Sequence, residues 1–170
     1  QSVSLPQSYL NRITGQGIYR DSVLTGAPVP LREPVLNGGV LGQDSVLPAL
    51  YRGRIYWFWG DTNRASYPLG NFRMSGATSE LVAKGGLPPS QGIDLNYFVN
   101  EDGFCRPLCP IVDEGLIWID GVTVLNDESG QERMVARYSH LRKLGDVLGQ
   151  GLVRFNDDTQ TFDKWLEIDL

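Results

Sequence analysis

The clearest pattern of hydrophobic positions lies in the first half of the chain. Residues 44–51 and residues 54–61 are rich in aromatic and branched side chains, which favour β-strands. Arg52 and Gly53 separate the two runs, and this spacing is typical of a tight hairpin turn. The pattern therefore predicts a β-hairpin, with Pro48 at a bulge or at a ladder position that needs no backbone donor.

Two further pairs of strand-like runs follow later in the chain. Residues 118–125 and 133–140 flank a polar turn at 126–130. Residues 151–155 and 161–165 flank a second polar turn. Each pair has the composition of a hairpin, in which two apolar runs are joined by turn-forming residues.

The other segments carry weaker signals. Residues 74–79 and 95–99 are strand-like, whereas the Gly- and Pro-rich residues 84–93 are predicted to form a loop. Residues 141–148 have room for one or two helical turns, although glycines interrupt them. Residues 1–43 contain many glycines and prolines, so we expect an irregular lead-in with at most one or two short strands.

The first two hairpins align with one another as an internal repeat. Asp44 aligns with Asp120 at an offset of 76 residues, and Arg54 aligns with Arg133 at an offset of 79, so the second turn is three residues longer. Each repeat adds two more strand-like runs, and four antiparallel strands per repeat are typical of a propeller blade. The sequence predicts an all-β fold of antiparallel four-stranded blades, with two similar hairpins in a β-sandwich as the alternative.

The length of 170 residues fits one domain. We expect residues 1–43 to be the lead-in and residues 44–170 to form one domain of two blades, at about 44–100 and 118–170. Because propellers close with four to eight blades, the chain is expected to be part of a longer polypeptide, and the rest of that propeller is an expected partner.

Composition and charge exclude several classes of function. The net charge of −5 gives no electrostatic footprint for nucleic acid or for an anionic membrane, and no apolar run approaches the roughly 20 residues of a membrane span. Cys105 and Cys109, with a single histidine elsewhere, cannot form a four-ligand zinc site. No metal or cofactor is expected. A disulfide across this loop is one alternative, but two unlinked thiols are favoured because the chain has no disulfide framework.

The hairpin registers bring ionisable residues together. With a two-residue turn, Asp44 faces Asp61 in the first hairpin, and Asp120 falls opposite or near His140 in the second. Opposed residues have Cβ atoms about 4.5–5.5 Å apart, and paired carboxylates suit acid/base hydrolysis because one can stay protonated while the other is ionised. Asp44, Asp61 and Asp120 are therefore candidate catalytic residues. The alternative is that the aspartates cap turns through backbone N–H groups and that the histidine is structural.

Aromatic side chains surround the first acidic pair. Successive strand residues face opposite sides, so Trp57 and Trp59 are expected on the same side as Asp61, where their rings could stack on a sugar. The loop after Asp61 leaves the same end of the hairpin and carries arginines. The alternative is that the tryptophans belong to the core of the sheet. The candidate substrate-binding residues share this predicted location near the acids: Trp57, Trp59, Arg64, Arg73 and His140.

Three short motifs resemble the opening blades of bacterial five-bladed β-propeller glycosidase-like proteins, a superfamily of arabinanases, xylosidases and invertase-like enzymes. They are Gly42-Gln-Asp-Ser45, Tyr56-Trp-Phe-Trp-Gly-Asp-Thr62 and Trp118-Ile-Asp-Gly121. The resemblance implies that acids at the axial ends of the innermost strands surround a sugar. Asp44 would match the base or nucleophile of the first blade, and Asp120 the acid of the second blade that stabilises the transition state or modulates a pKa.

The resemblance implies hydrolysis of an oligo- or polysaccharide through axial carboxylates. The catalytic acid of that superfamily, usually a Glu from a third blade, has no match in this chain. The expected partner is a carbohydrate, and an extracellular or periplasmic location is favoured. The alternative function is a non-catalytic carbohydrate-binding or scaffold module.

Overall fold

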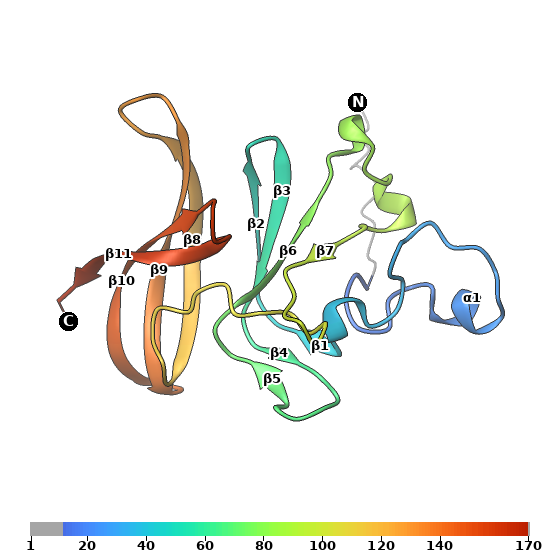
Figure 1. Ribbon diagram of the computed structural model, residues 1–170, viewed down its shortest axis with the longest axis horizontal. Coiled ribbons are helices and arrows are strands. Elements are labelled where there is room, and N and C mark those ends of the chain that lie inside the picture. Colours follow the sequence, from blue (N-terminus) through green and yellow to red (C-terminus); the bar gives the residue numbers. More distant parts are fainter. Residues whose placement is uncertain (1–11, 170) are drawn as a thin grey trace, which may run out of the picture.

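The computed structural model describes residues 12–169 as an assembly of three antiparallel sheets. Two four-stranded sheets stand side by side, and a small sheet lies at one end of the first (Figure 1). The first sheet has the order β2 (Val46–Tyr51), β3 (Arg54–Trp59), β6 (Ser75–Ser79) and β7 (Asn96–Tyr97). The second has the order β11 (Thr161–Ile168), β10 (Asp146–Asn156), β9 (Glu132–Lys143) and β8 (Leu116–Asn126). The small sheet has the order β1 (Gly42–Gln43), β4 (Thr62–Asn63) and β5 (Gly70–Asn71).

The predicted hairpin over residues 44–61 is confirmed. Strands β2 and β3 pair without a register shift. Arg52 and Gly53 have φ values of 47° and 74°, and the type I′ hairpin turn requires this left-handed conformation at both positions. Pro48 lies on β2, an edge strand of its sheet, where a residue without a backbone donor is tolerated.

The later strands are also confirmed, and those of the second sheet are longer than predicted. The helical turns expected within residues 141–148 are wrong, because this segment contains the end of β9 and the start of β10. Gly145 has a φ of 81° and forms the connecting turn with Leu144. The residues on both sides of the turn form their backbone hydrogen bonds across the β9–β10 pair, so a helix would add no further backbone hydrogen bonds.

The lead-in and the predicted loop contain short regular segments. The expectation for residues 1–11 lies outside the described residues. The helical segments are α1 (Arg20–Leu24) and 3₁₀ turns at Asn37–Gly39, Val82–Lys84 and Pro89–Gln91. Within residues 12–169, no helix is long and apolar enough to cross a membrane.

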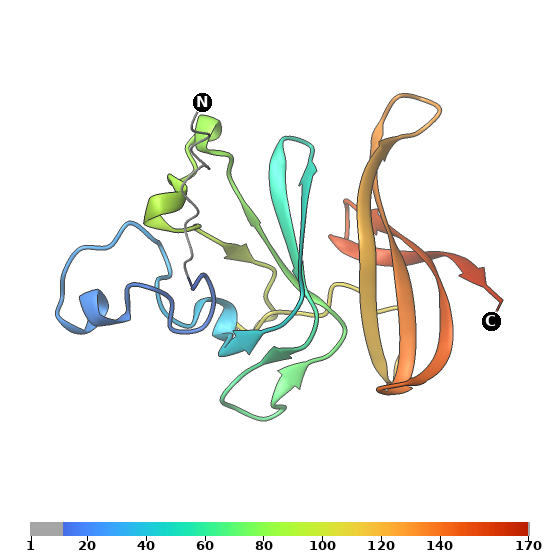
Figure 2. The same cartoon turned by 180° about the vertical axis from the view of Figure 1, so that it is seen from behind.

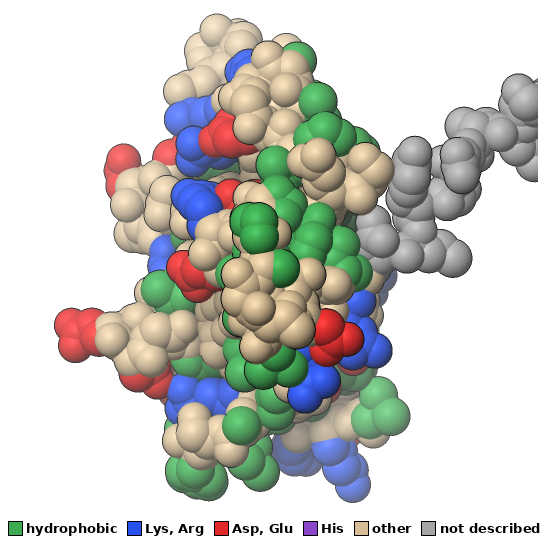
Figure 3. All heavy atoms as spheres, turned by 90° about the vertical axis from the view of Figure 1, so that its right-hand side faces the viewer, with side chains coloured by type: hydrophobic (Ala, Val, Ile, Leu, Met, Phe, Trp, Pro, Cys, Tyr) green, Lys and Arg blue, Asp and Glu red, His purple; other side chains and the backbone are tan. Residues whose placement is uncertain are grey.

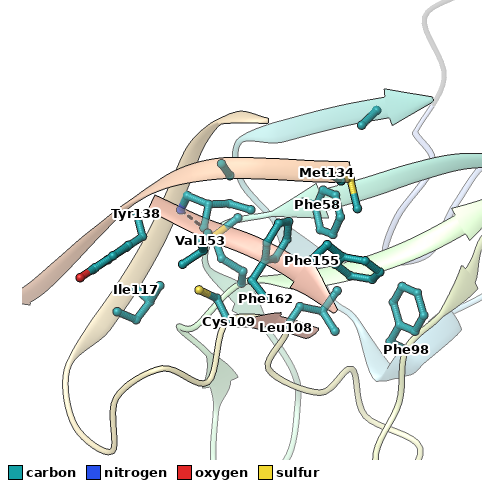
Figure 4. Close-up of a cluster of buried hydrophobic side chains, with 14 of the residues drawn as sticks. Phe58, Phe98, Leu108, Cys109, Ile117, Met134, Tyr138, Val153, Phe155 and Phe162 are labelled. Atoms are coloured by element: carbon teal, nitrogen blue, oxygen red, sulfur yellow. Dashed lines mark hydrogen bonds between the residues drawn. The ribbon is translucent and has the colours of Figure 1, made fainter. Parts of the chain in front are cut away.

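The two large sheets share one hydrophobic core. Strand β2 packs against β8. Both strands start near the small sheet and run away from it, as both views show (Figure 1 and Figure 2). Phe58 from β3 contacts Phe162 from β11 with ring centroids 5.1 Å apart, and Phe155 from β10 lies 5.3 Å from Phe162. Figure 4 shows these rings pointing toward one another between the sheets.

A second core covers the opposite face of the first sheet. Trp59 is 3% exposed and stacks on Tyr97 with ring centroids 5.4 Å apart. Val40 from the lead-in and Phe104 from the loop after β7 complete this cluster. The described part of the lead-in, residues 12–43, therefore belongs to the folded body, because it covers an apolar sheet face that would otherwise be exposed.

The predicted all-β class with antiparallel four-stranded sheets is confirmed. Neither large sheet closes on itself, and the part of the chain that the structure describes forms no closed barrel or propeller. The assignment of the two sheets as blades therefore stays a prediction.

Cys105 and Cys109 are free and buried. The expectation of two unlinked thiols is confirmed, and the alternative of a disulfide is wrong. Burial raises the pKa of both thiols to about 12. Their nucleophilic thiolate form is therefore scarce at neutral pH.

The two thiols are expected to be unreactive in the folded protein. At pH 8, a pKa near 12 leaves almost no thiolate on Cys105 or Cys109, and burial blocks the reagent. Ellman's reagent should modify both thiols rapidly in 6 M guanidinium chloride and slowly without it. Rapid reaction of the native protein would contradict the burial of these side chains.

Candidate acidic site at the start of the inner strands

Asp44 and Asp61 are neighbours, as the hairpin register predicts. Asp44 lies between β1 and β2, and Asp61 lies between β3 and β4. The backbone N–H of Asp44 donates to the carbonyl oxygen of Asp61 at 3.2 Å. In return, Oδ1 of Asp44 accepts the backbone N–H of Asp61 at 3.0 Å. The Asp44 side chain is exposed and that of Asp61 is half-buried.

A buried polar network fixes the residues beside this pair. Gln43 donates from Nε2 to the hydroxyls of Ser75 at 2.7 Å and Thr62 at 3.2 Å, and these two hydroxyls lie 2.7 Å apart. Tyr97 donates to Oε1 of Gln43 at 2.7 Å. Burial raises the pKa of Tyr97 further above its usual value, so this hydroxyl stays a donor. Because Gln43 and Thr62 flank the two aspartates in sequence, the network holds the acidic pair in place.

Asp61 also joins the two large sheets. Its Oδ1 accepts the indole N–H of Trp118 from β8 at 3.1 Å. Trp118 is the third residue of β8, and Asp61 lies between the end of β3 and the start of β4. Sequence reasoning missed Trp118 as a partner of Asp61, because the contact depends on how the two sheets dock rather than on the register within either hairpin.

Gly60 allows the Asp44 carboxylate to lie against the chain. A Cβ at this position would be 2.5 Å from Oδ1 of Asp44, which is too close for two non-bonded atoms. The side chain of Asp44 would then have to leave the N–H of Asp61. Gly60 is therefore required for the geometry of the acidic pair.

Gly60→Ala is expected to lower the free energy of unfolding by about 0.5–1.5 kcal/mol, because the displaced Asp44 carboxylate loses its hydrogen bond to the N–H of Asp61. Gly42→Ala is the matched control, since a Cβ there would meet nothing within 4 Å. Urea denaturation of both variants measures the difference. Equal stability of the two variants would show that the hydrogen bond between the Asp44 carboxylate and the N–H of Asp61 does not stabilise the fold.

Asp120 and His140 are not opposed, and this expectation is wrong. Asp120 pairs with Arg137, whereas His140 pairs with Ile117 and contacts the carbonyl oxygen of Glu114 at 3.0 Å. Counting from the pair of Leu125 and Arg133 places Asp120 opposite Tyr138, two residues short of His140. A bulge between Asp120 and Thr123 then moves the partner by one more residue, to Arg137. Among residues 12–169, Asp120 makes no hydrogen bond or ion pair to Asp44 or Asp61.

The tryptophans do not border the acids as expected. Trp59 is buried against Tyr97, so the core interpretation holds for this residue. Trp57 is half-buried and lines a cavity together with Arg54, which is the first residue of β3. Asp61 follows the opposite end of that strand. The prediction that Trp57 and Trp59 share one face of β3 is correct. The second core covers this face at the end of the strand nearer Asp61.

Arg64 and Arg73 line one cavity of about 440 Å³ beside the small sheet. Arg64 is largely engaged: it pairs with Asp102 at 2.7 Å, donates to two backbone carbonyl oxygens, and lies over the Phe104 ring. Arg73 donates to the carbonyl oxygen of Asp113. Asp44 and Asp61 do not line this cavity, so the arginines and the acidic pair form two separate features at the same end of the molecule.

No family model, curated protein or solved structure matches this chain. The sequence located Asp44 and Asp61 as a pair, and the structure brings them together. It does not bring Asp120, His140, Trp57 or Trp59 into contact with that pair.

Proposed function

We propose that this chain supplies two blades and one acidic site to a carbohydrate-hydrolysing β-propeller. Two features support the proposal. Each large sheet is a four-stranded antiparallel meander in chain order, as in a propeller blade. The edge strands β2 and β8 pack against one another, as the innermost strands of neighbouring blades would.

The single observation that carries the catalytic part is the geometry of Asp44. Its Oδ1 is held by the N–H of Asp61, while its Oδ2 has no hydrogen bond within residues 12–169 and the side chain is exposed. A carboxylate that is oriented through one oxygen and free at the other suits a general base or a nucleophile.

Asp61 acts as a positioning residue in this proposal. Its backbone N–H orients Asp44, and its carboxylate holds Trp118 of the second sheet. Glycoside hydrolysis uses a second carboxyl group as the acid. We assign that acid to a part of the propeller outside these two blades, as the resemblance to the glycosidase superfamily implies.

A non-catalytic carbohydrate-binding module is the second candidate. The observation that favours it is that Asp61, the acid beside Asp44, accepts the indole N–H of Trp118 and so serves the fold. Asp120 lies opposite Arg137 on the neighbouring strand. In this function the acids would orient sugar hydroxyls without bond cleavage.

One experiment separates the two functions. The full-length protein is incubated with arabino-, xylo-, fructo- and galacto-oligosaccharides, and reducing ends and binding heat are measured on the same samples. Release of reducing ends from any of them supports hydrolysis. Binding without cleavage supports the module, and neither binding nor cleavage contradicts both.

A further inference from the structure

A cavity of about 570 Å³ lies at the opposite end of the first sheet from the acidic pair. It opens beside the start of β3 and the end of β6, on the face turned away from the second sheet. The segment over residues 80–94 forms its outer wall. Its volume falls within the roughly 300–1,000 Å³ of small-ligand sites. On this side of the molecule, hydrophobic side chains form a band flanked by charged groups (Figure 3).

Trp57 gives this cavity a rigid aromatic wall. Its indole N–H donates to the hydroxyl of Ser79 at 2.9 Å, and its ring stacks on Trp59 with centroids 6.5 Å apart and an interplanar angle of 17°. Both contacts fix the ring before any ligand arrives. A preformed aromatic surface binds a ring with little loss of side-chain entropy.

Two ion pairs stand among the lining residues. Arg54 pairs with Glu80 at 2.5 Å, and Arg32 pairs with Asp94 at 2.6 Å. Each positive charge has a negative partner, so the cavity favours an uncharged occupant. Each pair also offers N–H donors beside carboxylate acceptors, and a hydroxyl group can use both because it donates and accepts.

Apart from the polar side chains Thr78, Ser79 and Asn96, the rest of the lining carries no polar side chain and suits the body of a ring. Ile55 continues the face of Trp57 along the strand, and aliphatic side chains from the outer wall complete it. These side chains are Leu81, Val82, Leu87 and Ile93. An apolar surface with a few polar groups that fix orientation is the usual composition of a ligand site.

We propose that this cavity binds an uncharged ring that lays an apolar face on Trp57 and presents hydroxyl groups to the two ion pairs. A sugar residue and a hydroxylated aromatic ring share this chemistry. The site is separate from the acidic pair and independent of the hydrolytic function proposed above, because Arg54 and Asp61 flank opposite ends of β3.

The test is titration of the full-length protein with 2-naphthol and with arabinobiose, xylobiose, galactobiose and cellobiose, each followed by calorimetry. We expect saturable binding of at least one ligand, and the ligand that binds identifies the source. Val82→Arg should weaken that binding at least tenfold, because Val82 lines the cavity and a long cation would enter it. Trp57→Phe keeps the apolar bulk and should weaken binding through loss of ring area.

Val147→Arg is the matched control. Val147 lies on β10 in the second sheet and is 44% exposed, whereas Val82 is 55% exposed, so both substitutions place an arginine at an exposed valine. Circular dichroism confirms that each variant is folded. Absence of binding by all five ligands, or equal binding by Val82→Arg and Val147→Arg, would overturn the proposal. Asp44→Asn should leave this binding unchanged even where it abolishes hydrolysis.

Discussion

Asp44→Asn is expected to lower the turnover of the full-length protein by about 10²–10⁴-fold, the usual contribution of a positioned acid or base. An amide cannot act as a base or nucleophile at the free oxygen. The amide oxygen can still accept the N–H of Asp61, which Oδ1 accepts at 3.0 Å in the native protein. The fold should therefore survive. Rates of reducing-end release, together with thermal melts, measure both effects.

Asp120→Asn is the matched control for this prediction. Asp120 is exposed and lies opposite Arg137, so its replacement should change turnover by less than about tenfold, below the usual effect of a catalytic acid or base. A large loss of turnover in Asp120→Asn would show that Asp120 also belongs to the catalytic site. Full activity of Asp44→Asn would refute the catalytic role of Asp44.

Phe162→Ala is expected to lower the free energy of unfolding by about 3–5 kcal/mol, because it leaves a cavity in a packed core. Phe162 has no exposed surface and contacts Phe58 of the first sheet and Phe155 of the second. The loss should therefore affect both sheets together. Urea unfolding followed by tryptophan fluorescence should show one transition at a lower midpoint.

Leu144→Ala is the control for the core variant. Leu144 is 79% exposed in the turn between β9 and β10, and surface replacements away from special features usually stay within about 0.5 kcal/mol. Two separate transitions in Phe162→Ala, or a loss no larger than in Leu144→Ala, would contradict a core shared by the two sheets.

The hairpin registers show where residue counting succeeds and where it fails. The first hairpin has a two-residue turn and no register shift, so counting outward from Arg52 and Gly53 correctly paired Asp44 with Asp61. The second hairpin contains a bulge after Asp120. The register at the turn places Asp120 opposite Tyr138 rather than His140, and the bulge moves its partner by one further residue, to Arg137. Nothing in the hydrophobic pattern marks the longer turn's register or the position of the bulge.

Burial shows a second limit. Alternation along β3 correctly predicted that Trp57 and Trp59 share a face. It could not predict that the lead-in and the loop after β7 would cover part of that face, burying Trp59 and leaving Trp57 beside a cavity. These segments lie far from β3 in sequence and carry no periodic signal of their own.

The strands, the tight first turn and the adjacency of Asp44 and Asp61 follow from the local amino-acid pattern, because each depends on residues close together in the chain. Side-chain alternation and turn chemistry act over a few residues and can be read locally. The contact of Asp61 with Trp118, the burial of Trp59 and the position of Trp57 beside a cavity follow only from the docking of distant segments. Those contacts join residues from separate sheets and loops, and they depend on how the apolar faces dock, which local patterns do not specify.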